Sequence, residues 1–252
     1  MSHNKHYVFG LHSVRQVLTN DVSRVIEVWA QQNRQDEKLL SLLTLIQQQG
    51  LAVQYVPKKT LDKLANLGHH QGIVIRCHIG KEKNSVDLDD LLAQLTEMPF
   101  LLVLDGVQDP HNLGACLRTA DAVGVHAVII PKHRACGLTP TVEKVASGAA
   151  DNVPLIQVTN LANTLQQLQT QGIWVLGAAE EAEQTIFTAD FNRPLALVLG
   201  AEGKGLRHLT KNYCDALVRI PMFGKVESLN VSVATGVCLY EAVRQRAGTN
   251  EK

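Results

Sequence analysis

The sequence Leu195-Ala-Leu-Val-Leu-Gly-Ala-Glu-Gly-Lys-Gly205 passes from five consecutive apolar residues into a turn with three glycines. A run that is apolar at every position is typical of a strand covered on both faces, as in a parallel sheet. The glycines allow a ligand to approach the backbone closely. Their spacing is neither GxGxxG nor that of a Walker P-loop, which argues against an ordinary nucleotide-binding Rossmann protein. Glu202 lies between these glycines, where it either caps the next helix or orients a catalytic group.

Further apolar runs recur on both sides of this stretch, separated by segments with helical spacing. This alternation predicts a doubly wound α/β domain with a parallel sheet. Strands are expected at residues 100–104, 127–130, 153–158, 173–176, 195–199 and 217–220, and helices at 113–123, 141–150, 161–171 and 231–246. Open α/β sheets bind ligands in the crevice outside the carboxyl ends of their strands. We therefore expect the polar residues that follow these strands to converge on one pocket.

The first eighty residues alternate more quickly between short helices and strands. Helices are expected at 11–18, 37–49 and 60–67, and strands at 24–30, 51–56 and 72–77. This pattern predicts a small layered α/β unit. A polar, turn-rich stretch follows it, so we expect a domain at residues 1–80, a linker at 81–97 and a second domain at 98–252.

The composition limits the class of protein. The formal net charge is zero, which excludes a protein that binds polyanions by bulk charge alone. Residues 1–80 are nevertheless basic, with nine Lys and Arg against five Asp and Glu. The five cysteines have no metal-site spacing, which indicates reduced thiols and a cytoplasmic protein without a metal. The N-terminus lacks the apolar core of a signal peptide, and no run approaches the ~20 apolar residues of a membrane span.

A second informative block, Asn112-Leu-Gly-Ala-Cys-Leu-Arg118, begins a predicted helix. Asn112 is a natural N-cap, and a role at a site is equally open. Arg118 stands alone among small and apolar residues. It is either aimed at an anion or paired with Asp121 three residues on.

A third block, Ser228-Leu-Asn-Val-Ser-Val-Ala-Thr-Gly236, precedes the C-terminal helix. Its polar residues Ser228, Asn230 and Ser232 are all capping types, so one of them is expected to cap that helix. Capping explains one or two of these positions but not all three.

Together the three blocks resemble the three signature motifs of the SPOUT class of methyltransferases, in its SpoU/TrmH branch. The order, the spacing and the intervening strands all agree. The stretches Gly10–Val14 and Asp105–Gly114 further resemble members that methylate the ribose 2′-hydroxyl of a guanosine in the peptidyl-transferase region of 23S ribosomal RNA. The resemblance spans nearly the whole chain.

This resemblance implies a fold and a set of partners. The C-terminal α/β domain should contain a deep trefoil knot near residues 195–240, an exception to the rule that chains avoid threading. The N-terminal unit should be a ribosomal-protein-like RNA-binding domain. The cofactor should be S-adenosylmethionine and the substrate 23S ribosomal RNA. The protein should form a homodimer through the knotted domain, with the active site close to that interface.

The resemblance also implies roles for individual residues. Arg118 should contact the target 2′-oxygen and an adjacent phosphate. In the family this Arg is proposed as the general base, but a guanidinium with a pKa above ~12 is better suited to stabilise an oxyanion. Asn112, Glu202 and Asn230 should orient the Arg and the ribose. The corresponding cofactor-binding positions are Gly200, Ile220, Leu229, Ala178 and Ser228.

Two other functions fit the same residues. One is a transfer RNA 2′-O-ribose methyltransferase of the same class, against which the N-terminal unit argues. The other is a non-catalytic RNA-binding ribosome assembly factor, against which the intact motif residues argue. In either case the RNA phosphates need cations, and the N-terminal candidates are Lys5, Arg15, Lys58, Lys59 and Arg76.

Overall fold

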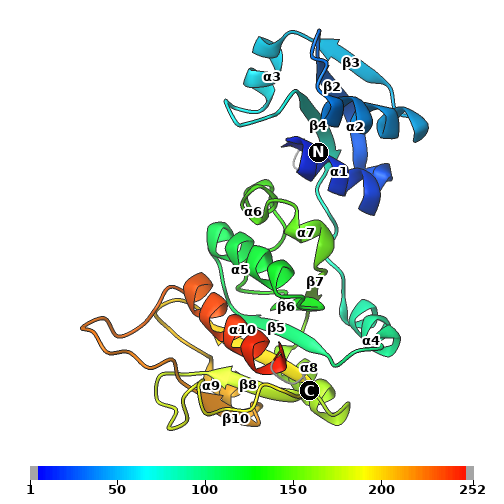
Figure 1. The fold of residues 1–252 in the computed structure, drawn as a ribbon. Coiled ribbons are helices and arrows are strands. Elements are labelled where there is room, and N and C mark those ends of the chain that lie inside the picture. The colour runs from blue at the N-terminus through cyan, green and yellow to red at the C-terminus, as the bar shows by residue number, and fades with distance from the viewer. Residues whose placement is uncertain (1–4, 248–252) are drawn as a thin grey trace. The chain divides into compact units, whose positions relative to one another are not determined.

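The computed structural model describes residues 5–247 of the 252-residue chain (Figure 1). The chain divides into two compact units, Met1–Lys81 and Glu82–Lys252, and each has its own hydrophobic core. A four-stranded sheet forms the first unit and a six-stranded sheet the second. Between residues 5 and 247, no helix has the length and apolar character needed to cross a membrane.

The first unit is a mixed sheet with helices packed against it. Its elements are β1 (Lys5–Phe9), α1 (Leu11–Asn20), the short 3-10 helix η1 (Val22–Arg24), β2 (Val25–Gln31), α2 (Glu37–Gln48), β3 (Val53–Val56), α3 (Lys58–Leu64) and β4 (Ile73–His78). The strand order is β1-β4-β2-β3, with β2 parallel to β3 and β4 antiparallel to both neighbours. The sequence predicts every one of these strands except β1, whose five residues become a strand by pairing with β4.

The second unit is the doubly wound domain that the apolar runs predict. Its elements are α4 (Ser85–Gln94), β5 (Phe100–Asp105), α5 (Pro110–Ala122), β6 (Ala127–Pro131), α6 (Pro140–Ala146), α7 (Ala149–Asn152), β7 (Leu155–Val158), α8 (Leu161–Thr170), β8 (Trp174–Ala178), β9 (Leu195–Gly200), α9 (His208–Asn212), β10 (Ala216–Val218) and α10 (Val231–Ala247). The strand order is β10-β8-β9-β5-β6-β7, and all five pairings are parallel. The predicted α/β sheet is confirmed, and the trefoil knot stays a prediction.

Helices cover both faces of this sheet, as Figure 1 shows. One core lies beneath α5, α6 and α10, and the other beneath α4 and α8. Helices α5 and α6 approach closely at Gly114, where an added Cβ would lie 2.7 Å from the Cβ of Val145. The glycine of the Asn112–Arg118 block therefore serves helix packing. It does not line a ligand site.

The stretch 81–97 contains an ordered helix. Asn84 and Asp87 form a capping box at the start of α4. In this box the side chain of each residue accepts a hydrogen bond from the backbone N–H of the other residue. Leu88 on this helix is buried in the core of the second unit. Residues 82–97 thus belong to the second unit.

The helix expected over residues 141–150 is interrupted. Ser147 and Gly148 both adopt left-handed backbone conformations, with φ angles of 54° and 96°. A left-handed residue cannot continue a right-handed helix, so the segment forms α6 and α7 instead of one helix.

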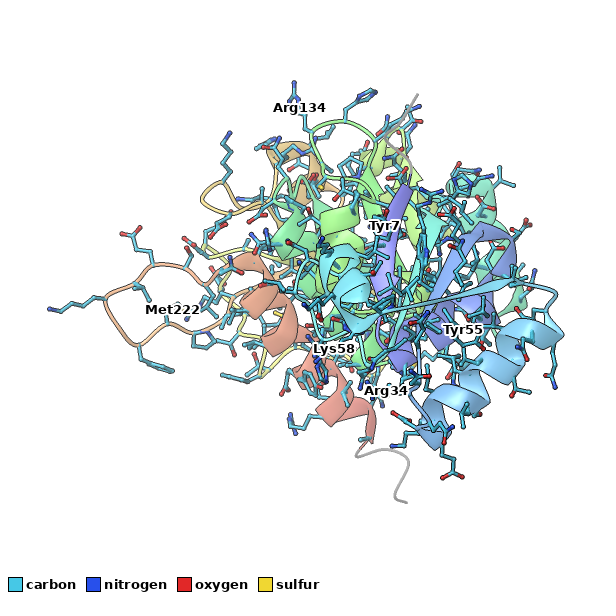
Figure 2. All side chains as sticks on the ribbon, turned by 90° about the horizontal axis from the view of Figure 1, so that it is seen from above. Tyr7, Arg34, Tyr55, Lys58, Arg134 and Met222 are labelled. Atoms are coloured by element: carbon cyan, nitrogen blue, oxygen red, sulfur yellow. The ribbon has the colours of Figure 1, made fainter. Side chains whose placement is uncertain are left out.

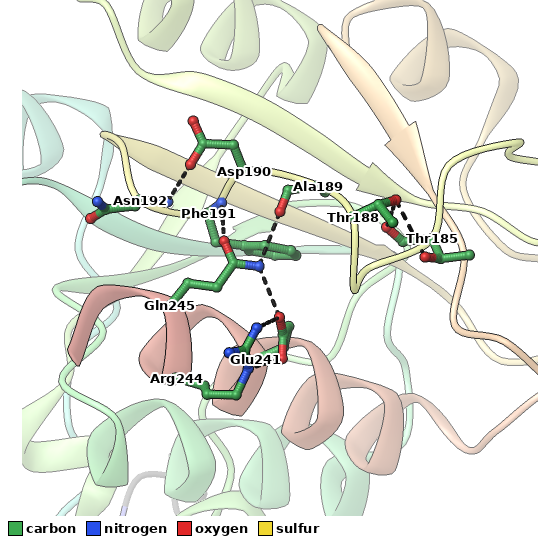
Figure 3. Close-up of polar contacts among 9 residues, drawn as sticks. All are labelled: Thr185, Thr188, Ala189, Asp190, Phe191, Asn192, Glu241, Arg244 and Gln245. Carbon is green, nitrogen blue, oxygen red and sulfur yellow. Dashed lines mark hydrogen bonds and ion pairs between the residues drawn. The ribbon is translucent and has the colours of Figure 1, made fainter. Parts of the chain in front are cut away.

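The end of α10 is tied to the segment that connects β8 and β9 (Figure 3). The side chain of Gln245 accepts from the backbone N–H of Phe191 at 2.9 Å and donates to the carbonyl of Ala189 at 3.0 Å. Gln245 also donates to Glu241 at 2.8 Å, and Glu241 accepts two hydrogen bonds from Arg244. This network holds the C-terminal helix against a loop about fifty residues earlier in the sequence.

We expect Glu241→Gln to lower the free energy of unfolding at neutral pH by about 1 kcal/mol. The Arg244 guanidinium lowers the pKa of the Glu241 carboxyl from its ordinary value of 4.5. A carboxyl whose pKa is lowered by folding stabilises the protein above its unfolded pKa, and this contribution disappears as pH falls through the folded pKa. Urea denaturation from neutral pH to about pH 3 should therefore show the difference between wild type and variant shrinking. A difference that stays constant would contradict this role.

Candidate active site

Four neighbouring strands bring the candidate residues to one edge of the sheet. Strands β10, β8, β9 and β5 are adjacent and parallel, so their carboxyl ends lie at the same edge. The segments that leave these ends carry Asn112 after β5, Glu202 after β9 and Asn230 after β10. This is the edge at which open α/β sheets bind ligands.

These three side chains form one hydrogen-bonded triangle, which we call the polar triangle. Asn112 donates to Glu202 at 3.3 Å, and Asn230 donates to Asn112 at 3.0 Å and to Glu202 at 3.3 Å. The Oδ1 of Asn230 accepts from the backbone N–H and the hydroxyl of Ser232 at 2.9 and 2.6 Å. These two bonds orient the side-chain amide of Asn230, so its NH2 group must point toward Asn112 and Glu202.

The local roles of the two asparagines differ from one another. Asn112 is not the N-cap of α5. Asp109 fills that position by accepting from the backbone N–H of His111 at 2.9 Å, with Pro110 in the first turn. Asn112 instead lies inside the helix, 8% exposed, where its side chain is free to join the triangle. Asn230 does cap α10, as the sequence predicts for one residue of its block.

A cavity of about 370 Å³ lies beside the polar triangle. The five residues that the sequence assigns to cofactor binding all line it, and they are Ala178, Gly200, Ile220, Ser228 and Leu229. Charged residues also line it: Glu180, Glu181, Glu202, Glu227, Lys204 and Lys211. The hydrogen bond from Lys211 lowers the pKa of the Glu181 carboxyl, which keeps that group ionised. The lining thus combines apolar walls with an excess of negative charge.

The turn after β9 forms one wall of this cavity. The backbone N–H of Gly205 donates to the carbonyl of Ala201 at 2.9 Å, which folds the chain back on itself. An added Cβ on Gly200 would lie 2.0 Å from the carbonyl carbon of Gly205. Gly203 and Gly205 have φ angles of +70° and +60°, which favour glycine. The turn therefore requires glycine at position 200 because the chain packs closely there, and favours glycine at 203 and 205 because of their backbone conformation.

The structure places Arg118 apart from the polar triangle. It lies six residues beyond Asn112 on α5, or about 240° around the helix axis. Its side chain is exposed and lines neither this cavity nor the one described below. It is not paired with Asp121, which accepts from Asn152 at 3.2 Å. Within one chain, the structure brings together three of the four predicted catalytic residues.

A second cavity, of about 420 Å³, lies on the other side of residues 201–205. At its floor the buried carboxylate of Asp105 accepts from the Nε and the backbone N–H of Arg207, at 2.6 and 3.1 Å. Neither residue of this pair belongs to the three motif blocks. A signal was present, because a carboxylate directly ends a strand that is otherwise wholly apolar.

Comparisons with known proteins identify the family of each unit. The model of the SpoU rRNA Methylase family matches residues 99–240, and the model described as RNA 2′-O ribose methyltransferase substrate binding matches residues 7–82. The chain is 54% identical to the 23S rRNA (guanosine-2′-O-)-methyltransferase RlmB of Shewanella oneidensis, over 95% of this chain and 97% of that protein. It is 51% identical to RlmB of Escherichia coli, over 95% and 98%.

A solved structure shares the fold over nearly the whole length. The SpoU methyltransferase AviRb from Streptomyces viridochromogenes, in complex with the cofactor AdoMet, gives a TM-score of 0.79 at 24% identity and covers 97% of this chain and 92% of its own. The family match spans more than half of the sequence and includes all three motif blocks. This chain therefore belongs to the SpoU rRNA Methylase family.

Proposed function

We propose that this protein transfers a methyl group from S-adenosylmethionine to the ribose 2′-hydroxyl of a guanosine in 23S ribosomal RNA. The observation that carries the proposal is the polar triangle, whose Glu202 lines the same cavity as all five predicted cofactor positions. The identity to RlmB proteins over nearly the full length supports the choice of substrate. A target in the peptidyl-transferase region is part of the proposal and rests on the resemblance alone.

The first cavity fits S-adenosylmethionine in size and charge. Pockets for small molecules begin at about 300 Å³ and combine apolar walls with a few polar groups. At neutral pH this cofactor carries a sulfonium, an ammonium and one carboxylate, so its net charge is positive. The four carboxylates of the lining outnumber its two lysines, which complements that charge. When bound, the cofactor supplies an electrophilic methyl group.

The protein's own residues then position the acceptor. The Asn112–Glu202 and Asn230–Glu202 hydrogen bonds hold a carboxylate and two amides in one orientation beside the cavity. Such a preorganised set aligns a ribose hydroxyl with the methyl donor, which removes several kcal/mol of barrier, on the order of 7–11 in favourable cases. Arg118 would stabilise the developing negative charge on the 2′-oxygen.

In a homodimer, Arg118 would act at the active site of the partner chain, because it lines neither cavity of its own chain. Val233 and Tyr240, on the outer face of α10, are 52% and 57% exposed, and Phe223 in the preceding loop is 95% exposed. Helices α10 and α5 pack together, and Arg118 is an exposed residue of α5. A second copy covering α10 would bury these side chains and bring Arg118 toward the partner's cavity. This supports a dimer through the second unit.

The first unit would bind the RNA. Its match to the substrate-binding model and its positive charge support this role. We expect the affinity for rRNA to fall steeply with salt, because phosphate contacts release counterions. Deleting residues 1–81 is expected to weaken RNA binding by at least about tenfold and to leave the cofactor dissociation constant within about twofold. Filter binding across a salt series and calorimetry measure the two quantities, and a salt-independent RNA affinity would argue against this role.

The direct test of the function is a map of ribose methylation. Ribosomal RNA from cells with and without this protein should differ at one guanosine of 23S rRNA, and purified protein with S-adenosylmethionine should restore that mark on unmodified transcript. Methylation of transfer RNA and not of 23S rRNA would favour the tRNA alternative. Cofactor binding without transfer to any RNA would favour an assembly factor.

A further inference from the structure

The second cavity contains charges that the protein itself leaves unpaired. Its lining includes three cations, Arg134, Lys204 and Arg207. Arg207 is engaged by Asp105. The side chains of Arg134 and Lys204 are exposed and have no hydrogen-bond or ion-pair partner within residues 5–247. Two cations therefore remain free for a ligand at the rim.

Arg134 is held in an unusual backbone conformation there. Its φ angle is +62°, a left-handed value that is uncommon for a residue with a side chain. Its carbonyl oxygen lies against Gly106 on the cavity wall, 3.5 Å from the position of an added Cβ, and its side chain extends outward from the loop (Figure 2). Strain of this kind persists where the surrounding fold imposes it and is common at binding sites.

In contrast to these two cations, most of the carboxylates that line the second cavity already have partners. Asp105 is occupied by Arg207, and Glu202 is occupied by the polar triangle. Asp109 accepts from His111 through Oδ1, and its Oδ2 has no partner among the described residues. The ligand of this cavity thus meets two free cations and one free carboxylate oxygen.

We propose that this second cavity receives the target guanosine, with Arg134 and Lys204 binding its flanking phosphates and Asp109 accepting hydrogen bonds from the guanine edge. The inference rests on the proposed function and names the acceptor site for it. The two cavities share Ala201, Glu202, Lys204, Gly205 and Val231, so donor and acceptor would meet at Glu202 of the polar triangle.

The unpaired charged groups of the second cavity indicate the chemistry of the ligand that it would bind. A cavity that takes in a whole nucleotide requires that nucleotide to leave its stack, which exposes the Watson–Crick edge of the base for recognition. Guanine presents two adjacent N–H donors on that edge, whereas adenine presents one amino group beside an acceptor. An ionised carboxylate only accepts hydrogen bonds, so the free Oδ2 of Asp109 suits the N–H donors of guanine and would face an acceptor on adenine. Two cations at the rim match the phosphates on either side of the flipped nucleotide.

The phosphate contacts are tested with Arg134→Ala/Lys204→Ala in the full-length protein. The dissociation constant for unmodified 23S rRNA transcript is expected to rise about tenfold, and the slope of its logarithm against that of salt to fall by about 1.5, which corresponds to two lost phosphates. The cofactor control is the single variant Arg134→Ala, whose cofactor affinity should stay within about twofold of wild type because Arg134 does not line the first cavity. Lys144→Ala is the matched control, because Lys144 is an exposed cation of the same unit that lines neither cavity.

The base contact is tested with Asp109→Asn, which keeps a good N-cap for α5 and removes the charge. Guanosine monophosphate is expected to inhibit methyl transfer by the wild type at least about fivefold more strongly than adenosine monophosphate, and the variant should lose this preference. A wild type that does not discriminate, or a variant that keeps the preference, overturns the base assignment.

If the double variant binds RNA with wild-type affinity and salt slope while the wild type methylates rRNA, the inference fails and the proposed function stands. A wild type that transfers no methyl group to any RNA overturns the proposed function instead.

Discussion

Replacing Arg118 with Ala is expected to lower the single-turnover rate of methyl transfer by about 10²–10³-fold, the loss typical of removing one donor to a developing oxyanion. Cofactor affinity should stay near that of wild type, because Arg118 does not line the cofactor cavity. Arg118→Lys is the companion variant. It keeps the charge and loses the two-pronged hydrogen bonding, so it should recover only part of the rate. Near-normal turnover in Arg118→Ala would remove this residue from the mechanism.

Mixed dimers test whether Arg118 acts at the cofactor cavity of its own chain or at that of the partner chain. In a heterodimer of Arg118→Ala with Gly200→Ala, one chain lacks the guanidinium and the other lacks a working cofactor cavity. If Arg118 acts across the interface, one complete site forms, and the heterodimer should show about half of the wild-type activity. If Arg118 acts within its own chain, no complete site forms and the heterodimer is inactive. Differently tagged chains that are co-expressed and purified in two steps provide the sample.

Replacing Gly200 with Ala is expected to abolish cofactor binding, with the dissociation constant rising at least about 100-fold. The added Cβ would lie 2.0 Å from the carbonyl carbon of Gly205, 2.2 Å from its oxygen and 2.3 Å from the backbone nitrogen of Leu206. These atoms are backbone and cannot rotate away, so the turn that forms the cavity wall must shift. Overpacking of this kind also destabilises a protein by about 1–3 kcal/mol, which thermal unfolding would show.

Gly224→Ala provides the matched control for this variant. A Cβ on Gly224 would meet no atom within 4 Å, and this residue does not line the cofactor cavity. We expect wild-type cofactor affinity and an unchanged melting temperature. Calorimetric titration with S-adenosylmethionine compares the three proteins. If Gly200→Ala binds the cofactor as tightly as Gly224→Ala does, the turn 200–206 does not form the cofactor site.

Much of the second unit was predictable from the sequence because its signals are local. Runs such as Leu195–Leu199 are apolar at every position, and only a strand buried on both faces tolerates that pattern. The same reasoning located all six parallel strands within two residues of their ends and placed Asn112, Glu202 and Asn230 after strand termini. The cap of α10 by Asn230 was also predictable, since capping depends on residues within one turn.

Other features depended on contacts between distant parts of the chain. Whether Asn112 caps a helix or faces Glu202 depends on Asp109, which caps α5 three residues earlier and leaves the side chain of Asn112 to a partner ninety residues away. The direction of Arg118 follows from the packing of α5 against α6 and α10, which fixes the rotation of the helix. Local pattern shows that a segment is helical, but the rotation of the helix and the contacts of each side chain are set by what packs against it.

The sequence by itself thus determined the two-unit organisation, the parallel sheet and the motif residues, because backbone propensity and the burial pattern act over short stretches. Tertiary structure alone decided that Glu202 of the polar triangle lines two cavities, that Asp105 is paired with Arg207, and that Arg118 lines neither cavity. The reason is physical: the charge that a side chain leaves free for a ligand depends on which neighbours have already paired with it, and those neighbours come from distant segments of the chain.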